Sequence, residues 1–327
     1  MTVMTYIQAV TTALKEEMQL DENVFILGED VGKKGGVFRA TDGLYDEFGE
    51  YRVLDTPLTE SAIAGVGIGA AMYGKRPVAE MQFADFIMPA VNQIISEAAR
   101  IRYRSNNDWT CPITIRAPYG GGVHGGLYHS QSVEAVFANQ PGLKIVMPST
   151  PYDVKGLLKA AIRDNDPVLF FEHKRAYRLL KGEVPEEDYV LPIGKADVKR
   201  EGSDVTVITY GLCVHLALQA AEKLEKEGID THILDLRTVY PLDKEAIIEA
   251  ASKTGKVLLV TEDNLEGSII GEVSAIIAEN CLFDLDAPIQ RLAGPDIPAM
   301  PYAQPMERYF MVDETKVEAA IRDLAEF

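Results

Sequence analysis

The sequence predicts an α/β protein with two domains, each a parallel sheet between two layers of helices. Short runs of strand-forming residues alternate with helical segments along most of the 327 residues, which is typical of parallel sheets covered on both faces. The alternation stops around residues 174–203, where charged and proline-containing sequence has no clear periodicity. We therefore expect a first domain at residues 1–185, a linker at 186–203 and a second domain at 204–327.

In the first domain, short apolar runs bounded by glycine, proline or polar residues predict strands, and longer segments with apolar residues at helical spacing predict helices. The run Val24–Gly28, for example, is typical of a buried strand. The expected elements are, in order, a helix at 5–19, strands at 24–28 and 52–54, a helix at 61–73, a strand at 77–82, a helix at 89–104, strands at 113–116 and 144–147, a helix at 151–164 and a strand at 168–171.

The second domain follows the same pattern on a smaller scale. Gly228 follows a helical segment, as is typical of a helix C-terminus. The expected elements are a strand at 205–209, a helix at 214–227, a strand at 231–236, a helix at 244–253, a strand at 257–261, a helix at 268–280, a strand at 289–292 and a helix at 314–326. We expect a parallel sheet with right-handed crossovers.

Charge and composition restrict the partners and the compartment. The formal net charge of −18 argues against nucleic acid or an anionic membrane surface as a partner, because like charges repel. Cys111, Cys213 and Cys281 lie far apart and lack the paired spacing of a zinc site or a disulfide framework, which favours a reducing compartment. The apolar run at 62–73 is too short to span a bilayer. We expect a soluble, cytoplasmic protein.

The stretch from Val53 to Phe86 carries the first candidate site. Glu60 lies where a strand gives way to a helix, the usual position of a ligand site in an α/β sheet. Three glycines follow between 65 and 69, although each costs a helix roughly 1 kcal/mol relative to alanine, so another helix or a ligand is expected to approach closely there. Glu60 is therefore a candidate for proton transfer, or it complements the positive end of the helix dipole and does no more.

Other polar groups are weaker candidates. A glycine-rich loop brings His124 and His129 within reach of a ligand, and imidazole is the natural acid or base near neutral pH. Either ring can instead hydrogen-bond the loop backbone, which is the simpler explanation for His124. Glu29 ends a strand on the side where ligands bind, or is a turn residue. Asp164 and Asp166 flank a turn that offers carbonyl ligands for a hard cation, or is a plain turn.

Spaced motifs along the whole chain carry a family resemblance. They are Gly28-Glu-Asp-Val-Gly, Asp55-Thr-Pro-Leu-Thr-Glu, Gln82-Phe-Ala-Asp-Phe, Gly120-Gly-Gly-Val-His, Leu127-Tyr-His-Ser-Gln-Ser and Asp235-Leu-Arg-Thr-Val-Tyr-Pro-Leu-Asp. The chain resembles the β subunit of the thiamine-diphosphate-dependent decarboxylating component of 2-oxoacid dehydrogenase complexes. The resemblance implies a pyrimidine-type thiamine-diphosphate-binding domain followed by a transketolase C-terminal-like domain. The branched-chain member is most similar, and the pyruvate and acetoin members remain alternatives.

The resemblance also implies roles for single residues. Glu60 matches the glutamate that hydrogen-bonds the aminopyrimidine ring of thiamine diphosphate and promotes proton exchange there. His129 matches the histidine that faces the incoming lipoyl group, which implies proton transfer during reductive acylation. Residues that match the aminopyrimidine pocket are Glu29, Leu58, Gln82 and Phe86, the last of which replaces a tyrosine of animal branched-chain members.

Metal ions and partners follow from the same resemblance. Residues that match a structural potassium site, mostly through carbonyl groups, are Ile113, Thr114, Ala161, Asp164 and Asp166. The chain contains no Gly-Asp-Gly segment, with which this cofactor class holds diphosphate and magnesium. We therefore expect an α subunit to supply that half of the site in an α2β2 heterotetramer. A lipoyl-bearing acyltransferase core and a 2-oxoacid substrate are the other implied partners. A transketolase-like enzyme and a non-catalytic scaffold subunit are the competing interpretations.

Overall fold

The computed structural model describes residues 1–327 and divides into two compact units. The first unit comprises Met1–Tyr119 and Val136–Ile193, and the second comprises Gly120–Ala135 and Gly194–Phe327. Segment 120–135 therefore belongs to the second unit although it lies among residues of the first in the sequence. None of the helices combines the length and the apolar composition needed to cross a bilayer.

The first unit is built on a parallel sheet, as expected from the sequence. Within this unit the strands lie in the order β6-β7-β5-β4-β2-β3. Their bounds are β2 (Val24–Gly28), β3 (Val53–Asp55), β4 (Arg76–Glu80), β5 (Thr114–Tyr119), β6 (Lys144–Val146) and β7 (Val168–His173). The chain leaves β2 towards β3 on one side and returns to β4 on the other side of β2. The boundary between β2 and β4 is thus a topological switch point, where ligands bind in open α/β sheets.

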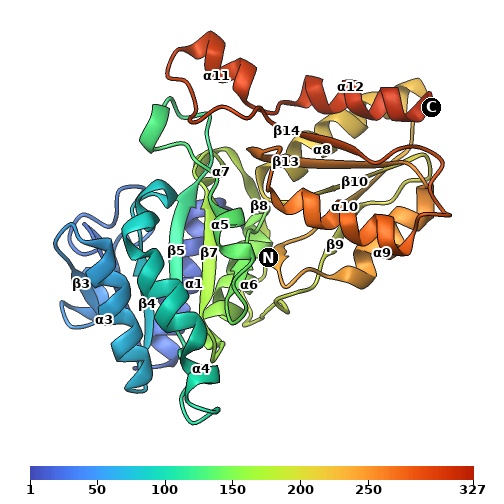
Figure 1. The fold of residues 1–327 in the computed structure, drawn as a ribbon. Coiled ribbons are helices and arrows are strands. Elements are labelled where there is room, and N and C mark those ends of the chain that lie inside the picture. The colour runs from blue at the N-terminus through green and yellow to red at the C-terminus, as the bar shows by residue number, and fades with distance from the viewer. The chain divides into compact units, whose positions relative to one another are not determined.

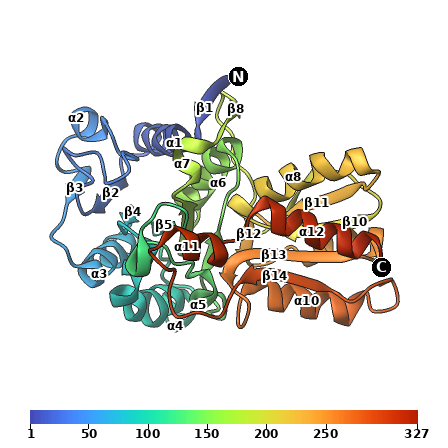
Figure 2. The same ribbon diagram turned by 90° about the horizontal axis from the view of Figure 1, so that it is seen from above.

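Helices cover both faces of this sheet (Figure 2). On one face α1 (Tyr6–Leu20) packs against α6 (Pro151–Arg163), and on the other lie α3 (Glu60–Met72) and the helical stretch at 84–104. A capping box at Thr5 begins α1, and the Thr150 side chain caps α6. The interior between α1, α6 and the strands is fully buried and apolar. The expected three-layer architecture is confirmed for this unit.

The regular helix expected at 89–104 is wrong. The chain instead forms a 3₁₀ helix at Ala84–Ala90, a π-helical turn at Gln93–Glu97, a 3₁₀ turn at Ala98–Arg100 and α4 (Ile101–Arg104). Pro89 lies inside this stretch and has no N–H for an α-helical hydrogen bond, which explains the irregular start. Smaller elements that were not expected are β1 (Thr2–Thr5) paired antiparallel with β8 (Lys181–Val184), and the short helices α2 (Leu44–Phe48), α5 (Glu134–Ala138) and α7 (Ala176–Leu179).

The second unit has a smaller sheet with the strand order β14-β13-β10-β11-β9. Its strands are β9 (Asp197–Arg200), β10 (Val205–Thr209), β11 (Thr231–Asp235), β13 (Val257–Asn264) and β14 (Gln290–Gly294), and β12 (Thr238–Tyr240) follows β11 in the chain. The expectation of a purely parallel sheet is wrong at one edge, because β9 pairs antiparallel with β11. This edge strand lies within the segment expected to be a linker.

Figure 1 shows the helices of the second unit on both faces of its sheet. On one side α8 (Leu212–Leu224) packs with α12 (Glu314–Ala325), and on the other α9 (Lys244–Thr254) packs with α10 (Ile269–Asn280). The short α11 (Gln304–Phe310) precedes α12. The chain leaves β10 towards β11 and returns to β13 on the other side of β10, so this sheet also has a switch point.

Candidate functional site

The carboxyl edge of the first sheet gathers the residues expected to bind a cofactor. The register places Gly28 of β2 beside Asp55 of β3 and Glu80 of β4, so these strands end at the same level. The residues that follow each strand therefore share one edge, at the switch point. The expected site residues at this edge are Glu29 after β2, Leu58 and Glu60 after β3, and Gln82 and Phe86 after β4.

Two buried carboxyl groups lie at this edge, close enough for one to act on the charge of the other. Glu60 begins α3 and Glu29 follows β2, and each is 8% exposed. Burial raises the pKa of Glu29, and the negative charges of Glu60 and then Asp30 raise it further. Glu60 therefore complements the helix dipole, as one interpretation of the sequence had it, and also belongs to an acid pair. A buried carboxyl group beside a second acid is suited to proton exchange with a ligand.

Other residues at this edge of the sheet include packed aromatic rings and an exposed apolar side chain. Phe86 packs edge-on against Phe83 at a centroid distance of 5.6 Å, and Phe83 packs edge-on against Phe38 at 5.3 Å. Leu58 is 78% exposed and is therefore available to a ligand or a partner. The hydroxyl of Thr56 is buried and has no hydrogen-bond partner.

A buried ionic network joins three neighbouring strands of the same sheet, β4, β5 and β7. Arg116 of β5 is fully buried and contacts Glu172 through Nε and Nη2, at 2.6 and 2.7 Å, and Glu80 through Nη1 at 2.7 Å. Tyr177 donates its hydroxyl proton to Glu172. Burial opposes the charge of Arg116, but the charges of Glu172 and Glu80 raise its pKa well above the ordinary range. Sequence inspection missed this network, although charged residues inside apolar strands were its signal.

The residues expected at a potassium site gather at the opposite, amino edge of the first sheet. Ile113 and Thr114 lie at the start of β5, Ala161 and Asp164 at the end of α6, and Asp166 just before β7. The carboxylate of Asp164 contacts Lys144 Nζ at 2.6 Å, and that of Asp166 pairs with Arg102. The carbonyl of Ile113 accepts the Val168 N–H at 3.0 Å, and that of Ala161 accepts the Asp164 N–H at 3.3 Å. Both carbonyl oxygens retain a second lone pair, whereas the carboxylates already have cationic partners.

Segment 120–135 carries the expected histidines and belongs to the second unit. Its ends meet where the Gly120 N–H donates to the Gln131 carbonyl at 3.1 Å, which is typical of a compact surface loop. The Gly121 N–H donates to the carboxylate of Glu262. Gly125 lies so close to His129 that a Cβ there would be 2.6 Å from the His129 carbonyl oxygen. Backbone contacts thus hold the part of the loop that bears His129.

His124 is held by a carboxylate and not by loop backbone, contrary to the simpler interpretation of the sequence. Its Nδ1 lies 2.6 Å from Oε2 of Glu307, and its N–H donates to Oε1 of the same residue at 3.2 Å. Glu307 is 4% exposed, whereas the His124 side chain is 53% exposed. The φ of His124 is 56°, in the left-handed region, which costs a non-glycine residue of order 1–3 kcal/mol. Such strain is common at functional sites.

A second group of buried acids lies at the carboxyl edge of the second sheet. Glu134 is 1% exposed and accepts the hydroxyl proton of Tyr210 at 2.8 Å, and Tyr210 also contacts the Thr261 hydroxyl at 2.7 Å. Burial and the charge of Asp263 raise the pKa of Glu134 to about 8. Burial also raises the pKa of Asp263, to about 6. Neither acid was singled out from the sequence, because Glu134 lies next to a motif that draws attention to the histidines.

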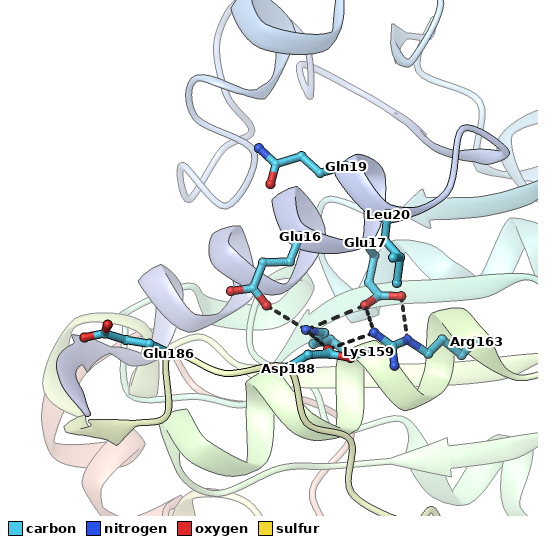
Figure 3. Close-up of a pocket in the computed structure, with 8 residues that line it drawn as sticks. All are labelled: Glu16, Glu17, Gln19, Leu20, Lys159, Arg163, Glu186 and Asp188. Atoms are coloured by element: carbon cyan, nitrogen blue, oxygen red, sulfur yellow. Dashed lines mark hydrogen bonds and ion pairs between the residues drawn. The ribbon is translucent and has the colours of Figure 1, made fainter.

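A polar pocket on the α1–α6 face of the first unit has a structural role. Figure 3 shows Lys159 and Arg163 of α6 pointing towards Glu16 and Glu17 of α1 and towards Asp188. Lys159 contacts Glu16 at 2.6 Å, and Arg163 contacts Glu17 at 2.7 Å and Asp188 at 2.9 Å. Both cations are therefore already paired, and the network fastens the segment around Asp188 to α6.

Comparison with known proteins identifies two domains and several relatives. Residues 2–179 match the transketolase pyrimidine binding domain, and residues 194–317 match the transketolase C-terminal domain. The chain is 82% identical to the 2-oxoisovalerate dehydrogenase subunit beta of Bacillus subtilis (strain 168) over 327 residues and 100% of both chains. It is 50% identical to the pyruvate dehydrogenase E1 component subunit beta of the same strain, again over 100% of both chains.

The fold comparison adds one solved structure, described as a split gene transketolase in an inactive beta4 tetramer. It superimposes with a TM-score of 0.80 and covers 99% of this chain and 98% of its own. At 23% identity it shows the shared fold alone. Both domain matches and the relative at 82% identity lead to the same conclusion. The chain belongs to the family of β subunits of thiamine-diphosphate-dependent 2-oxoacid dehydrogenases.

Proposed function

We propose that this chain supplies the aminopyrimidine half of a thiamine diphosphate site in a branched-chain 2-oxoacid dehydrogenase. The observation that carries the proposal is the pair of buried carboxyl groups, Glu60 and Glu29, at the switch point of the first sheet. The relative at 82% identity is named for 2-oxoisovalerate, which favours a branched 2-oxoacid as substrate. Pyruvate is the second candidate, because the pyruvate dehydrogenase subunits are 50% and 45% identical.

The residues at this edge fit an aminopyrimidine ring. Such a ring presents an amino donor, ring-nitrogen acceptors and an apolar face. Glu60 holds the proton exchanged at a ring nitrogen, and Glu29 keeps a second acid group beside it. Gln82, Phe86 and the exposed Leu58 line the ring. Thiamine diphosphate, when bound, supplies the electron sink for decarboxylation.

His129 transfers a proton during reductive acylation of a lipoyl group in this proposal. Its loop is fastened by backbone contacts, and Gly125 packs closely against the His129 backbone. The acyl acceptor is the lipoyl group of an acyltransferase core component.

The assembly is an α2β2 heterotetramer in this proposal. The α subunit holds the diphosphate and magnesium, since this chain lacks the Gly-Asp-Gly segment. In α3 the position of Gly67 is explained within the chain, because a Cβ there would be 2.7 Å from Ile113 Cδ1. A Cβ on Gly69 would meet nothing within 4 Å, so Gly69 is open to close packing by a second β subunit. Cross-linking from α3 in the assembled complex tests that contact.

Three further proposals follow from the resemblance. A potassium ion binds at the amino edge of the first sheet, mainly through carbonyl oxygens such as those of Ile113 and Ala161. A comparison of the thermal stability of the chain in potassium chloride and in lithium chloride tests this site.

The compartment is the cytoplasm, which suits three buried free cysteines. The domains extend over 1–185 and 204–327, and limited proteolysis between them tests these boundaries.

The decisive experiment is turnover of the α–β complex with thiamine diphosphate, magnesium and an artificial electron acceptor. We expect Glu60→Gln to lower kcat by about 100-fold or more, because the variant keeps the shape but cannot exchange the proton. Glu50→Gln, at an exposed loop position, is the matched control and should leave kcat unchanged. Preference for 3-methyl-2-oxobutanoate over pyruvate is expected. Full activity of Glu60→Gln would instead support a scaffold role for this chain.

A further inference from the structure

We propose that His124 and Glu307 form a proton-transfer dyad, in which the buried carboxylate orients the imidazole through Nδ1 and leaves Nε2 to exchange a proton with the acyl acceptor. The inference rests on the proposed function, because the acceptor is taken to be the disulfide ring of a lipoyl group. It adds a second imidazole to the one at His129, and it gives a role to a carboxylate on α11.

The contacts of Glu307 carry this inference. Both carboxylate oxygens are used by one residue: Oε2 lies 2.6 Å from the His124 ring nitrogen, and Oε1 accepts the His124 N–H at 3.2 Å. One hydrogen bond to the backbone would be enough to anchor the loop. The second contact restrains the direction of the ring, as a carboxylate does in hydrolytic triads. With Nδ1 engaged and 53% of the side chain exposed, Nε2 is the ring nitrogen available to a ligand.

The backbone at this position gives a second, independent reason. His124 has a φ of 56° and is followed by Gly125 and Gly126. Glycine adopts this conformation without strain, so a bulkier residue there needs a compensating contact or a function. Gly125 in turn packs against the backbone of His129, so the two histidines belong to one fastened loop. The dyad therefore lies on the same loop as the residue proposed to face the lipoyl group.

The chemical step balances as follows. The S–S bond of the lipoyl ring breaks, and one sulfur bonds to the acyl carbon with the electron pair released by decarboxylation of the 2-oxoacid. The other sulfur leaves with the pair of the broken S–S bond and takes a proton from Nε2 of His124. The hydroxyl proton released when the acyl carbonyl forms replaces it on the imidazole. The 2-oxoacid is oxidised by two electrons and the disulfide is reduced by two. The oxo group of the ionised 2-oxoacid takes up the hydroxyl proton before this step, so the overall conversion consumes one proton and the acyl transfer itself consumes none.

The first test separates this step from decarboxylation in the assembled complex. His124→Asn suits the left-handed backbone and can still donate a hydrogen bond to Glu307, but it cannot transfer a proton. We expect acylation of a free lipoyl domain to fall by about tenfold or more, with turnover by an artificial acceptor changed by less than about twofold. Unchanged acylation in His124→Asn would overturn the dyad, because a structural role survives this substitution. Loss of artificial-acceptor turnover in Glu60→Gln tests the proposed function separately.

The second test decides the case if the asparagine variant also disturbs the loop. His124→Gly removes the ring and tolerates the backbone conformation. Added imidazole is expected to restore acylation, whereas pyrazole, a ring of similar size and much weaker basicity, is not. Glu307→Gln should lower acylation as well, and Glu314→Gln, a more exposed carboxylate paired with Lys223, is its control. Failure of imidazole to restore any acylation in His124→Gly would refute the dyad.

Discussion

Two groups of buried carboxyl groups, one in each unit, differ in what compensates them. In the first unit Glu80 and Glu172 lie on either side of Arg116, which contacts both within 2.7 Å. In the second unit the neighbours that act on Glu134 are the acids Asp263 and Glu262 and the hydroxyl of Tyr210. Glu80, Glu172 and Glu134 are almost inaccessible to water.

The difference shows how a folded chain stabilises buried carboxyl groups with and without a neighbouring cation. A guanidinium between two carboxylates offsets part of their loss of hydration, so Arg116 lowers the pKa of Glu80 although burial raises it by more. Without a cation the charged form of an acid is penalised, so Glu134 and Asp263 retain protons to higher pH. The first group therefore depends on Arg116, and the second depends on pH.

The largest expected effect comes from removing the cation of the first group. Arg116→Leu leaves Glu80 and Glu172 buried without a charged partner, and we expect a loss of about 3–5 kcal/mol in the free energy of unfolding. Urea unfolding followed by circular dichroism measures it. Arg104→Leu breaks the more exposed pair with Glu97 and serves as the control, with an expected loss below about 1 kcal/mol. Equal losses in the two variants would contradict the dependence on Arg116.

For the second group we expect the free energy of unfolding to fall as pH rises, the opposite of acid denaturation. Folding raises the pKa of Glu134 from 4.5 to about 8, so between these values the folded chain binds more protons than the unfolded chain. The stabilising contribution is complete below the unfolded pKa and is lost as pH rises towards about 8. Each proton released on unfolding contributes a slope of at most about 1.4 kcal/mol per pH unit.

Thermal unfolding of the wild-type chain at about pH 6 and about pH 8 measures this slope. Tm is expected to fall over this range, and the fall should be smaller in Glu134→Gln, which has no proton to lose. Arg116→Leu provides a useful comparison, because burial already raises the pKa of Glu80 and loss of the cation should raise it further, which makes the fall in Tm steeper. A Tm of the wild-type chain that rises with pH would contradict the assignment of protons to Glu134.

Much of the fold followed from the sequence, and the buried charge networks did not. Apolar runs such as Val24–Gly28 predict strands because their burial depends on local composition, and both matched family domains agree with the resulting fold class. The irregular helix around Pro89 and the edge strand at Asp197–Arg200 depend on tertiary contacts that a local pattern does not contain. Strand order, and hence the switch point, is likewise a property of the whole sheet.

In the candidate sites, too, features of the local sequence were predictable and contacts between distant residues were not. Glu60 was singled out because a strand-to-helix junction is visible locally, and Glu29 because it follows the apolar strand Val24–Gly28. The partner of His124 is Glu307, which lies far away in the chain, and no spacing rule connects the two. Arg116 was passed over because a charged residue inside an apolar strand has no explanation until Glu80 and Glu172 are placed beside it.

The smallest expected effect on the free energy of unfolding comes from the same Glu→Gln substitution made in each of the two groups. Glu80→Gln removes one of the charges that Arg116 requires, and should cost about 1–3 kcal/mol. Glu134→Gln has the same change of atoms, but at about pH 6 it replaces a carboxyl group that already carries its proton, and its remaining oxygen can still accept from Tyr210. We expect a change in the free energy of unfolding of less than about 1 kcal/mol. Urea unfolding of both variants at the same pH measures the difference. If Glu134→Gln lowered the free energy of unfolding as much as Glu80→Gln does, Glu134 would be ionised in the folded chain. The contrast between a group stabilised by a cation and a group that keeps its proton would then be wrong.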